Sequence, residues 1–409
     1  MAKRTVTYLP ELVENNIELS VRHLKQFFKF GHGKSKFITK AVHNVSFDIK
    51  KGECFGVVGE SGCGKTTTGR TLIRLYKATS GSVYFKGYRI VAGNRWNEKE
   101  IKWKRIKARR KIKELQNEMN EKIHSLTDEQ GNADFIASET AKIKAEYDQQ
   151  IKKIESDLAE LIKEQKEKIA QHNYDNRHVD KKLMSKMQMI FQDPVDSLDP
   201  RMTVEDIIQE GLHIQGQYNR FENSQKVKDA LIKVGLLPEY ASRYPHEFSG
   251  GQRQRIGIAR ALIMNPDFLI CDEPISALDV SIRAQIINLL NNLKDEMGLT
   301  IMFIAHDLSV VKYFCDRIAV MYFGNIVEMA SSDELFKHPL HPYTRALLSA
   351  IPKPDPLSEK VRKRYVYKPQ EEHDYSKEAP SLVEVIPGHF VMANTEELEK
   401  YRKQINENK

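Results

Sequence analysis

The sequence predicts an α/β fold that is interrupted by a helical hairpin and followed by a short C-terminal extension. Residues 15–94 and 183–330 alternate short apolar runs with glycine turns, a pattern typical of strands and helices around one core. Residues 95–182 are rich in charge and contain no proline, which predicts long helices instead. Residues 331–409 are mostly polar, and they form the expected extension.

The composition limits the class of protein. Apolar residues make up 40% of the 409 positions and charged residues 29%, which predicts a soluble protein with a sizeable core. No run approaches 18 uninterrupted apolar residues, so we expect no membrane span. The opening "MAKRTVTYLPELVENN" lacks the apolar core of a signal peptide.

The cysteines indicate the redox compartment of the protein, and the net charge indicates which partners are possible. The four cysteines lack paired spacing, which favours a reducing cytosol and argues against disulfides and a cysteine metal site; they are Cys54, Cys63, Cys271 and Cys315. The net charge of +8 permits binding to nucleic acid or anionic lipid, although it also fits a merely solvated surface.

The first stretch with a chemical meaning is "GESGCGKT", residues 59–66. It follows the apolar run "CFGVV" and opens the helical stretch "TTGRTLIRL", the strand–loop–helix context of a phosphate-binding loop. Its glycines let backbone N–H groups curl around phosphate oxygens at a helix N-terminus. Lys65 can reach the β- and γ-phosphates of a nucleotide, and the Thr66 hydroxyl can bind Mg²⁺. The expected nucleotide contacts are Gly59, Glu60, Ser61, Gly62, Cys63, Gly64, Lys65, Thr66 and Thr67.

Residues 95–182 predict an antiparallel pair of helices with a narrow apolar seam. Two series of apolar residues are spaced by three and four, and "TDEQGNAD" separates them. The series are Ile112, Leu115, Met119, Ile123 and Leu126, then Tyr147, Ile151, Ile154, Leu158 and Leu161. Nine of the fifteen residues from Lys99 to Lys113 are basic, which fits a solvated face, lipid headgroups or RNA.

Two further apolar runs end in polar residues. "FLICDE", residues 268–273, predicts a buried strand that places Asp272 near Mg²⁺ and Glu273 near the γ-phosphate as a general base. "TIMFIAHD", residues 300–307, places His306 at a neighbouring strand end, where it can contact the γ-phosphate. Either run alone would be unremarkable, but the phosphate-binding loop in the same chain favours the catalytic interpretation.

"FSGGQRQR", residues 248–255, predicts a second helix N-terminus suited to phosphate. One nucleotide cannot use both helix ends of a single subunit at short range. We therefore expect a head-to-tail dimer, with ATP between the phosphate-binding loop of one chain and the Ser-Gly-Gly loop of the other.

In this order the motifs resemble those of the ATP-binding-cassette ATPases: Walker A at 59–66, the Q-loop "MIFQDP", the signature at 248–252, Walker B at 268–273, the D-loop "SALD" and the switch histidine. Phe248 is a departure, since leucine is more usual there. The resemblance implies a RecA-like core with an antiparallel β subdomain and a helical signature subdomain. It also implies that Gln192 contacts Mg²⁺ and the attacking water and couples the nucleotide to a membrane partner. The residues expected at the partner subunit's ATP are Ser249, Gly250, Gly251, Gln252 and Asp279.

The same family stacks adenine on an aromatic residue upstream of Walker A. In "LKQFFKF" we favour Phe28, with Phe27 and Phe30 as alternatives.

Longer stretches resemble the oligopeptide and dipeptide importer ATPases, and most of all the F-type subunits of oligopeptide permeases. They include "PHEFSGGQRQRIGIARALIMNP" and the tail "ELFKHPLHPYTRALLSAIPKPDP", which we expect to form a short helix between prolines, packed on the cassette. The resemblance implies an ATPase at the cytoplasmic face of the membrane that drives peptide import. Its partners would be a D-type ATPase subunit in a heterodimer, two permease membrane subunits and an extracytoplasmic peptide-binding lipoprotein.

The resemblance also raises the question of an iron–sulfur cluster and of other possible functions. Many relatives hold an iron–sulfur cluster after this tail, but no cysteine follows Cys315, so we expect none. Import of nickel or another solute stays open. ATPases of DNA repair and chromosome organisation also carry inserted coiled coils, but theirs follow the Q-loop, whereas this hairpin precedes Gln192 and has no Cys-x-x-Cys hook. A tandem-cassette translation factor would need a second P-loop. We expect no nucleic-acid partner.

Overall fold

The computed structural model describes residues 4–31, 35–128, 133–276, 278–351 and 365–407. The chain divides into two compact units. The larger unit comprises residues 8–91 and 179–409, and the smaller unit comprises residues 1–7 and 92–178. In the part of the chain that the structure describes, none of the helices combines the length and the apolar character that a membrane span requires.

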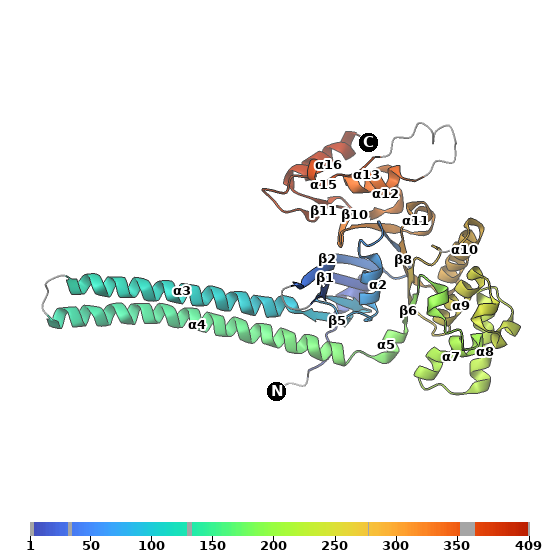
Figure 1. Cartoon of the computed structure of the whole chain (residues 1–409), viewed down its shortest axis with the longest axis horizontal. Helices are drawn as coiled ribbons and strands as arrows, with labels where there is room; N and C mark the ends of the chain where they lie inside the picture. The colour runs from blue at the N-terminus through green and yellow to red at the C-terminus, as the bar shows by residue number, and fades with distance from the viewer. Residues whose placement is uncertain (1–3, 32–34, 129–132, 277, 352–364, 408–409) are drawn as a thin grey trace. The chain divides into compact units, whose positions relative to one another are not determined.

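The larger unit contains two sheets (Figure 1). One has four strands in the order β2-β1-β4-β5, and β1 pairs antiparallel with both β2 and β4. Its strands are β1 (Ile17–Phe30), β2 (Phe37–Lys50), β4 (Ser80–Phe85) and β5 (Tyr88–Asn94), and the short helix α1 (Pro10–Glu14) precedes them. This is the antiparallel β subdomain that the resemblance to the ATP-binding-cassette ATPases implies.

The main sheet has the strand order β11-β12-β10-β9-β3-β8-β7-β6. The strands β9, β3, β8, β7 and β6 are parallel neighbours, and β10, β12 and β11 continue the sheet in antiparallel fashion. The bounds are β3 (Cys54–Val58), β6 (Met187–Ile190), β7 (Phe268–Asp272), β8 (Thr300–Ala305), β9 (Arg317–Tyr322), β10 (Asn325–Ser331), β11 (Ser381–Ile386) and β12 (His389–Ala393). Every residue of β3, β7 and β8 is buried, as expected for parallel strands covered on both faces.

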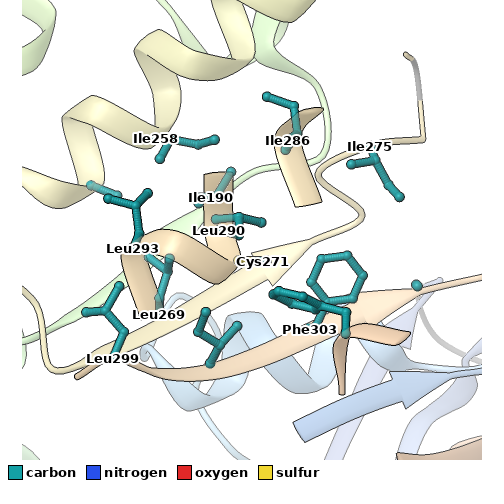
Figure 2. Packing of buried hydrophobic residues seen from close by; sticks show 14 of the residues in the cluster. Ile190, Ile258, Leu269, Cys271, Ile275, Ile286, Leu290, Leu293, Leu299 and Phe303 are labelled. Carbon is teal, nitrogen blue, oxygen red and sulfur yellow. The ribbon is translucent and has the colours of Figure 1, made fainter. Parts of the chain in front are cut away.

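Successive residues of each strand point to opposite faces of the sheet. On one face Leu269, Cys271 and Phe303 pack with helices on the same side, including Ile258 of α9 (Gly250–Leu262) and Leu290 of α10 (Val280–Met297) (Figure 2). Helices α7 (Val204–Ile214), α8 (Arg220–Lys233) and α11 (Leu308–Phe314) also contribute residues to this cluster, and α6 (Pro194–Ser197) packs against α9. Two 3₁₀ turns lie at Pro238–Ser242 and Pro245–Glu247.

The opposite face packs against the antiparallel sheet and α2 (Lys65–Leu72). Phe268, Ile270 and Met302 of the main sheet meet Leu19 of β1 and Leu72 of α2 in one buried cluster. The short helix α5 (Lys181–Ser185) leads into β6. The phosphate-binding loop therefore lies between β3 and α2, as the sequence predicts.

The C-terminal extension adds strands to the main sheet, which the sequence did not suggest. The hairpin β11–β12 pairs with β10 through Val391 and Phe390. The helices of this region are α12 (Ser332–Lys337), α13 (Pro342–Ser349), α15 (Pro369–Glu372) and α16 (Thr395–Glu407). The expected helix between prolines is α13, which begins at Pro342 because proline is pre-organised for the first helical position. Residues 352–364, including the closing prolines of that stretch, lie outside the described residues.

The smaller unit consists mainly of two long helices, α3 (Arg95–Asp128) and α4 (Ala133–Arg177), which pack side by side (Figure 1). Leu115 and Tyr147, one from each seam series, are about 5% and 4% exposed. The buried Asn97 amide donates a hydrogen bond to the Gln165 side chain across the pair at 2.7 Å. The expected turn falls on residues 129–132, outside the described residues.

Candidate active site

The functional side chains gather where parallel strands of the main sheet end. The phosphate-binding loop follows β3, Gln192 follows β6, Asp272 ends β7, and His306 follows β8. Since the carboxyl ends of parallel strands meet at one edge of the sheet, residues separated by more than 200 positions come together there. All of them except Asp272 contribute to the lining of a cavity of about 210 Å³; the lining residues are Ala41, Ser61, Gly62, Gly64, Lys65, Thr66, Thr67, Gln192, Glu273 and His306.

The phosphate-binding loop needs glycine at two tight positions. Gly59 and Gly64 have φ angles of +153° and +107°, which other residues rarely adopt. A Cβ at Gly59 would collide with the carbonyl oxygen of Met321, and one at Gly64 with that of Ala41. The loop therefore approaches β9 and β2 closely at both ends. Ala41 lines the cavity for this reason, and no pattern around it in the sequence indicates that position.

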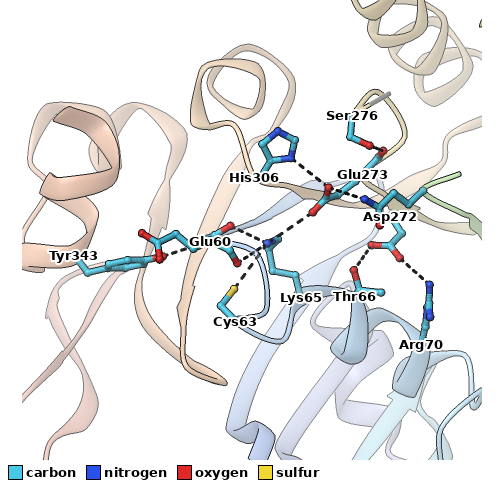
Figure 3. A network of polar contacts seen from close by, with 12 residues as sticks. Glu60, Cys63, Lys65, Thr66, Arg70, Asp272, Glu273, Ser276, His306 and Tyr343 are labelled. Carbon is cyan, nitrogen blue, oxygen red and sulfur yellow. Dashed lines mark hydrogen bonds and ion pairs between the residues drawn. The ribbon is translucent and has the colours of Figure 1, made fainter. Parts of the chain in front are cut away.

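Lys65 is held inside the loop. It is 4% exposed, and its ammonium donates hydrogen bonds to the carbonyl oxygens of Gly59 at 2.8 Å and Glu60 at 3.0 Å. The same nitrogen lies 3.8 Å from the carboxylate of Glu273 (Figure 3). A cation in this position can meet the terminal phosphates of a nucleotide that enters the cavity.

Asp272 offers an oxygen suited to a cation. Its carboxylate is fully buried, and Oδ1 accepts a hydrogen bond from the Thr66 hydroxyl at 2.7 Å. Oδ2 has no hydrogen-bond partner among the described residues, and the Arg70 guanidinium is 3.9 Å away. Burial raises the pKa of Asp272, although the hydrogen bond from Thr66 and the charge of Arg70 act against that shift. A buried, incompletely paired carboxylate beside a hydroxyl is an oxygen set that suits Mg²⁺.

Glu273 is placed by an unusual backbone and by two side chains. Its φ of +45° is rare for a residue other than glycine, and its backbone N–H donates to the Ile304 carbonyl at 3.0 Å. The Gln192 amide donates a hydrogen bond to Glu273 Oε2 at 3.2 Å. His306 Nδ1 lies 3.2 Å from the same oxygen (Figure 3). The Glu273 side chain is 14% exposed and that of His306 51%, so the carboxylate faces the cavity while the imidazole reaches solvent.

Tyr343 is a site residue that the sequence analysis missed. The backbone N–H of Glu60, in the phosphate-binding loop, donates a hydrogen bond to the Tyr343 hydroxyl at 3.0 Å (Figure 3). Tyr343 is 2% exposed, and burial raises its pKa, so the hydroxyl stays neutral. His341 caps α13 by accepting a hydrogen bond from the Tyr343 N–H. The "HPLHPYT" stretch was visible as a motif, but its contact with the loop was not.

The predicted signature residues do not line this cavity. Ser249 is the exposed N-cap of α9 and forms a reciprocal pair of hydrogen bonds with Gln252, a capping box. Gly250 and Gly251 form the first turn of that helix, and Asp279 is the exposed N-cap of α10. Phe248 is 5% exposed and packs edge-on against Tyr240 with ring centroids 5.3 Å apart, so this departure from the usual leucine fills the core.

The expected adenine contact is likewise not among the residues that line the cavity. Phe28 is partly buried and packs edge-on against Tyr76 with ring centroids 5.2 Å apart. The alternative Phe30 is 48% exposed and stacks on Phe37, while Phe27 stacks on His43. The choice of Phe28 stays a prediction.

Comparison with protein families gives two matches. A family model described as "ABC transporter" matches residues 42–167 and 156–276. A second model, described as "Oligopeptide/dipeptide transporter, C-terminal region", matches residues 327–377, which include α13 and Tyr343.

Curated relatives are similar over almost the whole chain. The oligopeptide transport ATP-binding protein OppF of Bacillus subtilis is 46% identical over 384 residues, which cover 94% of this chain and 98% of the relative. OppF of Streptococcus pyogenes serotype M1 is 44% identical over 92% of this chain and 95% of its own length. The oligopeptide transport ATP-binding protein AmiF of Streptococcus pneumoniae is 44% identical over 92% and 96%.

Among solved structures, a dimeric bacterial ABC transporter cassette matches with a TM-score of 0.50 and 21% identity, over 77% of this chain and 98% of the other. This likeness supports the fold, and it confirms the predicted fold class. The family matches and the close relatives go further: this chain belongs to the ABC transporter ATPases and, within them, to the family of oligopeptide transport ATP-binding proteins.

Proposed function

We propose that this chain is the ATP-hydrolysing subunit that energises import of oligopeptides or dipeptides through an ABC transporter. The observation that carries this proposal is the cavity at the sheet edge, where Lys65, Gln192, Glu273 and His306 surround one site in a chain that also has the transporter-type C-terminal region. The close relatives are oligopeptide transport ATP-binding proteins, which supports peptides over nickel as the cargo and transport over DNA repair as the function.

ATP would bind with its phosphates in the loop at residues 59–67. Lys65 would exchange the carbonyl oxygens of Gly59 and Glu60 for the β- and γ-phosphate oxygens, since a phosphate offers a full negative charge to the same ammonium. Thr66, Asp272 and Gln192 are the residues that would hold Mg²⁺, which neutralises negative charge on the phosphate oxygens. For the adenine we favour stacking on Phe28.

Glu273 would act as the general base. A water molecule attacks the γ-phosphorus, the bond to the β–γ bridging oxygen breaks, and ADP leaves with that electron pair. Glu273 accepts the proton that the water loses. Gln192 and His306 both reach Glu273 Oε2, so they can orient the carboxylate and the water, and His306 can also contact the γ-phosphate.

The site would be completed by a second subunit. Ser249, Gly251 and Gln252 lie on an exposed helix N-terminus that takes no part in the lining of this chain's cavity. With Gly250 and Asp279 they would meet the ATP of a D-type partner in a head-to-tail heterodimer, which closes on ATP and reopens after hydrolysis. Two permease subunits and an extracytoplasmic peptide-binding lipoprotein would complete the importer, with this chain at the cytoplasmic face of the membrane.

We propose the domain boundaries that the sequence suggested. Residues 15–94 and 183–330 would form the cassette, 95–182 an inserted hairpin, and 331–409 the extension. These domain bounds can be tested by truncating the chain at them and measuring by limited proteolysis whether each truncated chain is folded.

The transport proposal is tested by uptake in a strain that lacks the gene. Labelled dipeptides and oligopeptides should enter when the wild-type chain is restored, but not with Lys65→Ala, because the phosphates lose their cation. Nickel uptake is the matched comparison, and restored nickel but not peptide uptake would contradict the proposal. The composite site is tested separately: a strictly monomeric chain should bind ATP yet hydrolyse it far more slowly than the full complex.

A further inference from the structure

The smaller unit carries a stripe of tryptophan and basic side chains along α3. The stripe consists of Trp96, Lys99, Trp103, Lys107 and Arg110, all of them exposed. The two indoles are 61% and 67% exposed, and they are the only tryptophans in the chain. Tryptophan is large and apolar on most of its surface, so two such side chains on one water-facing helix require an explanation.

The spacing of the five residues places them on one side of the helix. Successive members are three, four, four and three positions apart, which follows the 3.6-residue turn. The seam faces elsewhere, because Trp103 and the buried Leu115 are separated by about 120° around the axis. The stripe is straight and about 21 Å long, since fourteen residues rise by about 1.5 Å each.

The charge of this stretch is strongly one-sided. From Lys99 to Lys113 there are nine basic residues and a single acid, Glu100. None of the three cations of the stripe forms an ion pair with a carboxylate in the part of the chain that the structure describes; nearby, Lys111 pairs with Glu114 at 3.6 Å. The positive charge of the stripe is therefore available to an anionic partner.

We propose that this stripe docks on an anionic phospholipid surface. Indole rings settle at the level of lipid headgroups, where the ring is shielded and its N–H stays hydrated. Lysine and arginine beside them bind headgroup phosphates, and a straight helix that lies flat brings all five side chains to one depth. Each cation near an anionic surface strengthens binding about fivefold, so the three of the stripe contribute on the order of 100-fold.

The shape of the stripe favours lipid over RNA. Single-stranded nucleic acid binds in positively charged grooves with stacking platforms, and the A-form major groove is too narrow for side chains to read. The outer face of one straight helix is convex and offers no such groove. The contact is also independent of the transport function proposed above, because the stripe lies outside the larger unit, which carries the nucleotide site.

Tryptophan fluorescence tests the proposal directly, because both tryptophans of the full chain belong to the stripe. Vesicles of phosphatidylglycerol and phosphatidylcholine should shift the emission to the blue, and brominated lipid should quench it. Pure phosphatidylcholine vesicles should do neither at the same lipid concentration, and added salt should reverse the shift. An unchanged spectrum with anionic vesicles, or an equal shift with neutral ones, would overturn the proposal.

Charge-reversal variants keep the fluorophores and separate the stripe from general basicity. The triple variant Lys99→Glu, Lys107→Glu and Arg110→Glu should bind anionic vesicles at least 100-fold more weakly. The matched control reverses three exposed lysines of α4 and should bind nearly as the wild type; it is Lys152→Glu, Lys153→Glu and Lys163→Glu. Helical circular dichroism and ATP binding verify that each variant is folded. Equal losses in both variants, or tighter binding to an RNA oligonucleotide than to vesicles, would refute a lipid-docking stripe.

Discussion

Replacing Tyr343 with phenylalanine removes one oxygen atom from the contact between the C-terminal extension and the phosphate-binding loop. The ring stays in place among Tyr322 and Tyr367, with centroids 4.4 Å and 5.6 Å away, so packing is preserved. What is lost is the acceptor for the Glu60 N–H at 3.0 Å. We expect the Tyr343→Phe chain to fold, but with a phosphate-binding loop that is held less firmly.

The size of the effect follows from the burial of the two groups. An average hydrogen bond contributes about 0.5–1.5 kcal/mol, and a fully buried N–H left without a partner costs about 1–3 kcal/mol. The hydroxyl is buried, but Glu60 is exposed, so water can partly replace it and a loss of about 1 kcal/mol is expected. Because 1.4 kcal/mol corresponds to a factor of ten, the Kd for ATP should rise about fivefold if the bond holds the loop in its binding shape.

Calorimetric titration with ATP measures that Kd, and denaturant unfolding measures the change in stability of the same sample. The matched control is Tyr367→Phe, which removes a hydroxyl from the same aromatic cluster but from a residue with no hydrogen bond to the phosphate-binding loop among the described residues. If Tyr343→Phe binds ATP within twofold of the wild type, or if both variants weaken ATP equally, the extension does not position the loop through this bond.

Three other predictions rest on the same structure. Glu273→Gln should keep ATP binding but slow hydrolysis in the assembled complex by a factor on the order of 10² to 10⁴, because the amide cannot accept the proton of the water; single-turnover kinetics measure this. Replacing residues 97–172 with a Gly/Ser linker should leave a folded, ATP-binding chain, because the apolar seam is buried between α3 and α4 and the entropic cost of loop closure changes little with loop length. The thermal midpoint of unfolding and a titration with ATP measure whether the chain stays folded and binds the nucleotide. His389→Asn should destabilise the extension by about 3 kcal/mol at pH 6 and by less at pH 9, as denaturant unfolding at the two pH values would show.

The pH dependence of the last variant has a definite sign. Burial alone would lower the pKa of His389, but the hydrogen bonds and charges of Glu328 and Glu334 outweigh it, so the pKa is raised. Such a group stabilises the fold fully below its unfolded pKa of about 6.5, and the contribution is lost as the pH rises through the folded pKa. The neighbouring His341 acts oppositely, because burial and the charges of His373 and Arg345 lower its pKa to about 3. His341 is present in both the wild-type chain and the His389→Asn variant, so its effect cancels in the difference between their free energies of unfolding.

For each of these three variants, a specific result would contradict the prediction. Unchanged turnover in Glu273→Gln would remove this residue from the role of base, and Asp272→Asn is the companion variant, which should weaken Mg²⁺-dependent binding instead. Aggregation of the linker chain would show that the hairpin contributes to folding of the cassette, whereas normal ATP binding with lost uptake would assign the hairpin to docking. A stability difference for His389→Asn that is equal at pH 6 and pH 9 would show that the buried ion pair with Glu328 is not formed.

The sequence by itself determined the features that local patterns encode. The octet at residues 59–66 predicts its own loop because three closely spaced glycines and the following helix define its shape, and β3 and α2 flank it as expected. Apolar residues spaced by three and four likewise predict α3 and α4, since the seam repeats with each turn. The order of the motifs was enough for the fold class and the family, both of which the comparisons confirm.

Only the tertiary structure decided which distant residues meet. Tyr343 accepts a hydrogen bond from Glu60 across 283 positions, and Val391 of the apparently polar tail pairs with Glu328 to extend the main sheet. Neither contact has a local signature, because strand pairing and buried hydrogen bonds depend on which surfaces pack together once the whole chain has folded. The same holds for Ala41, whose backbone borders the nucleotide cavity only because β2 passes beside Gly64.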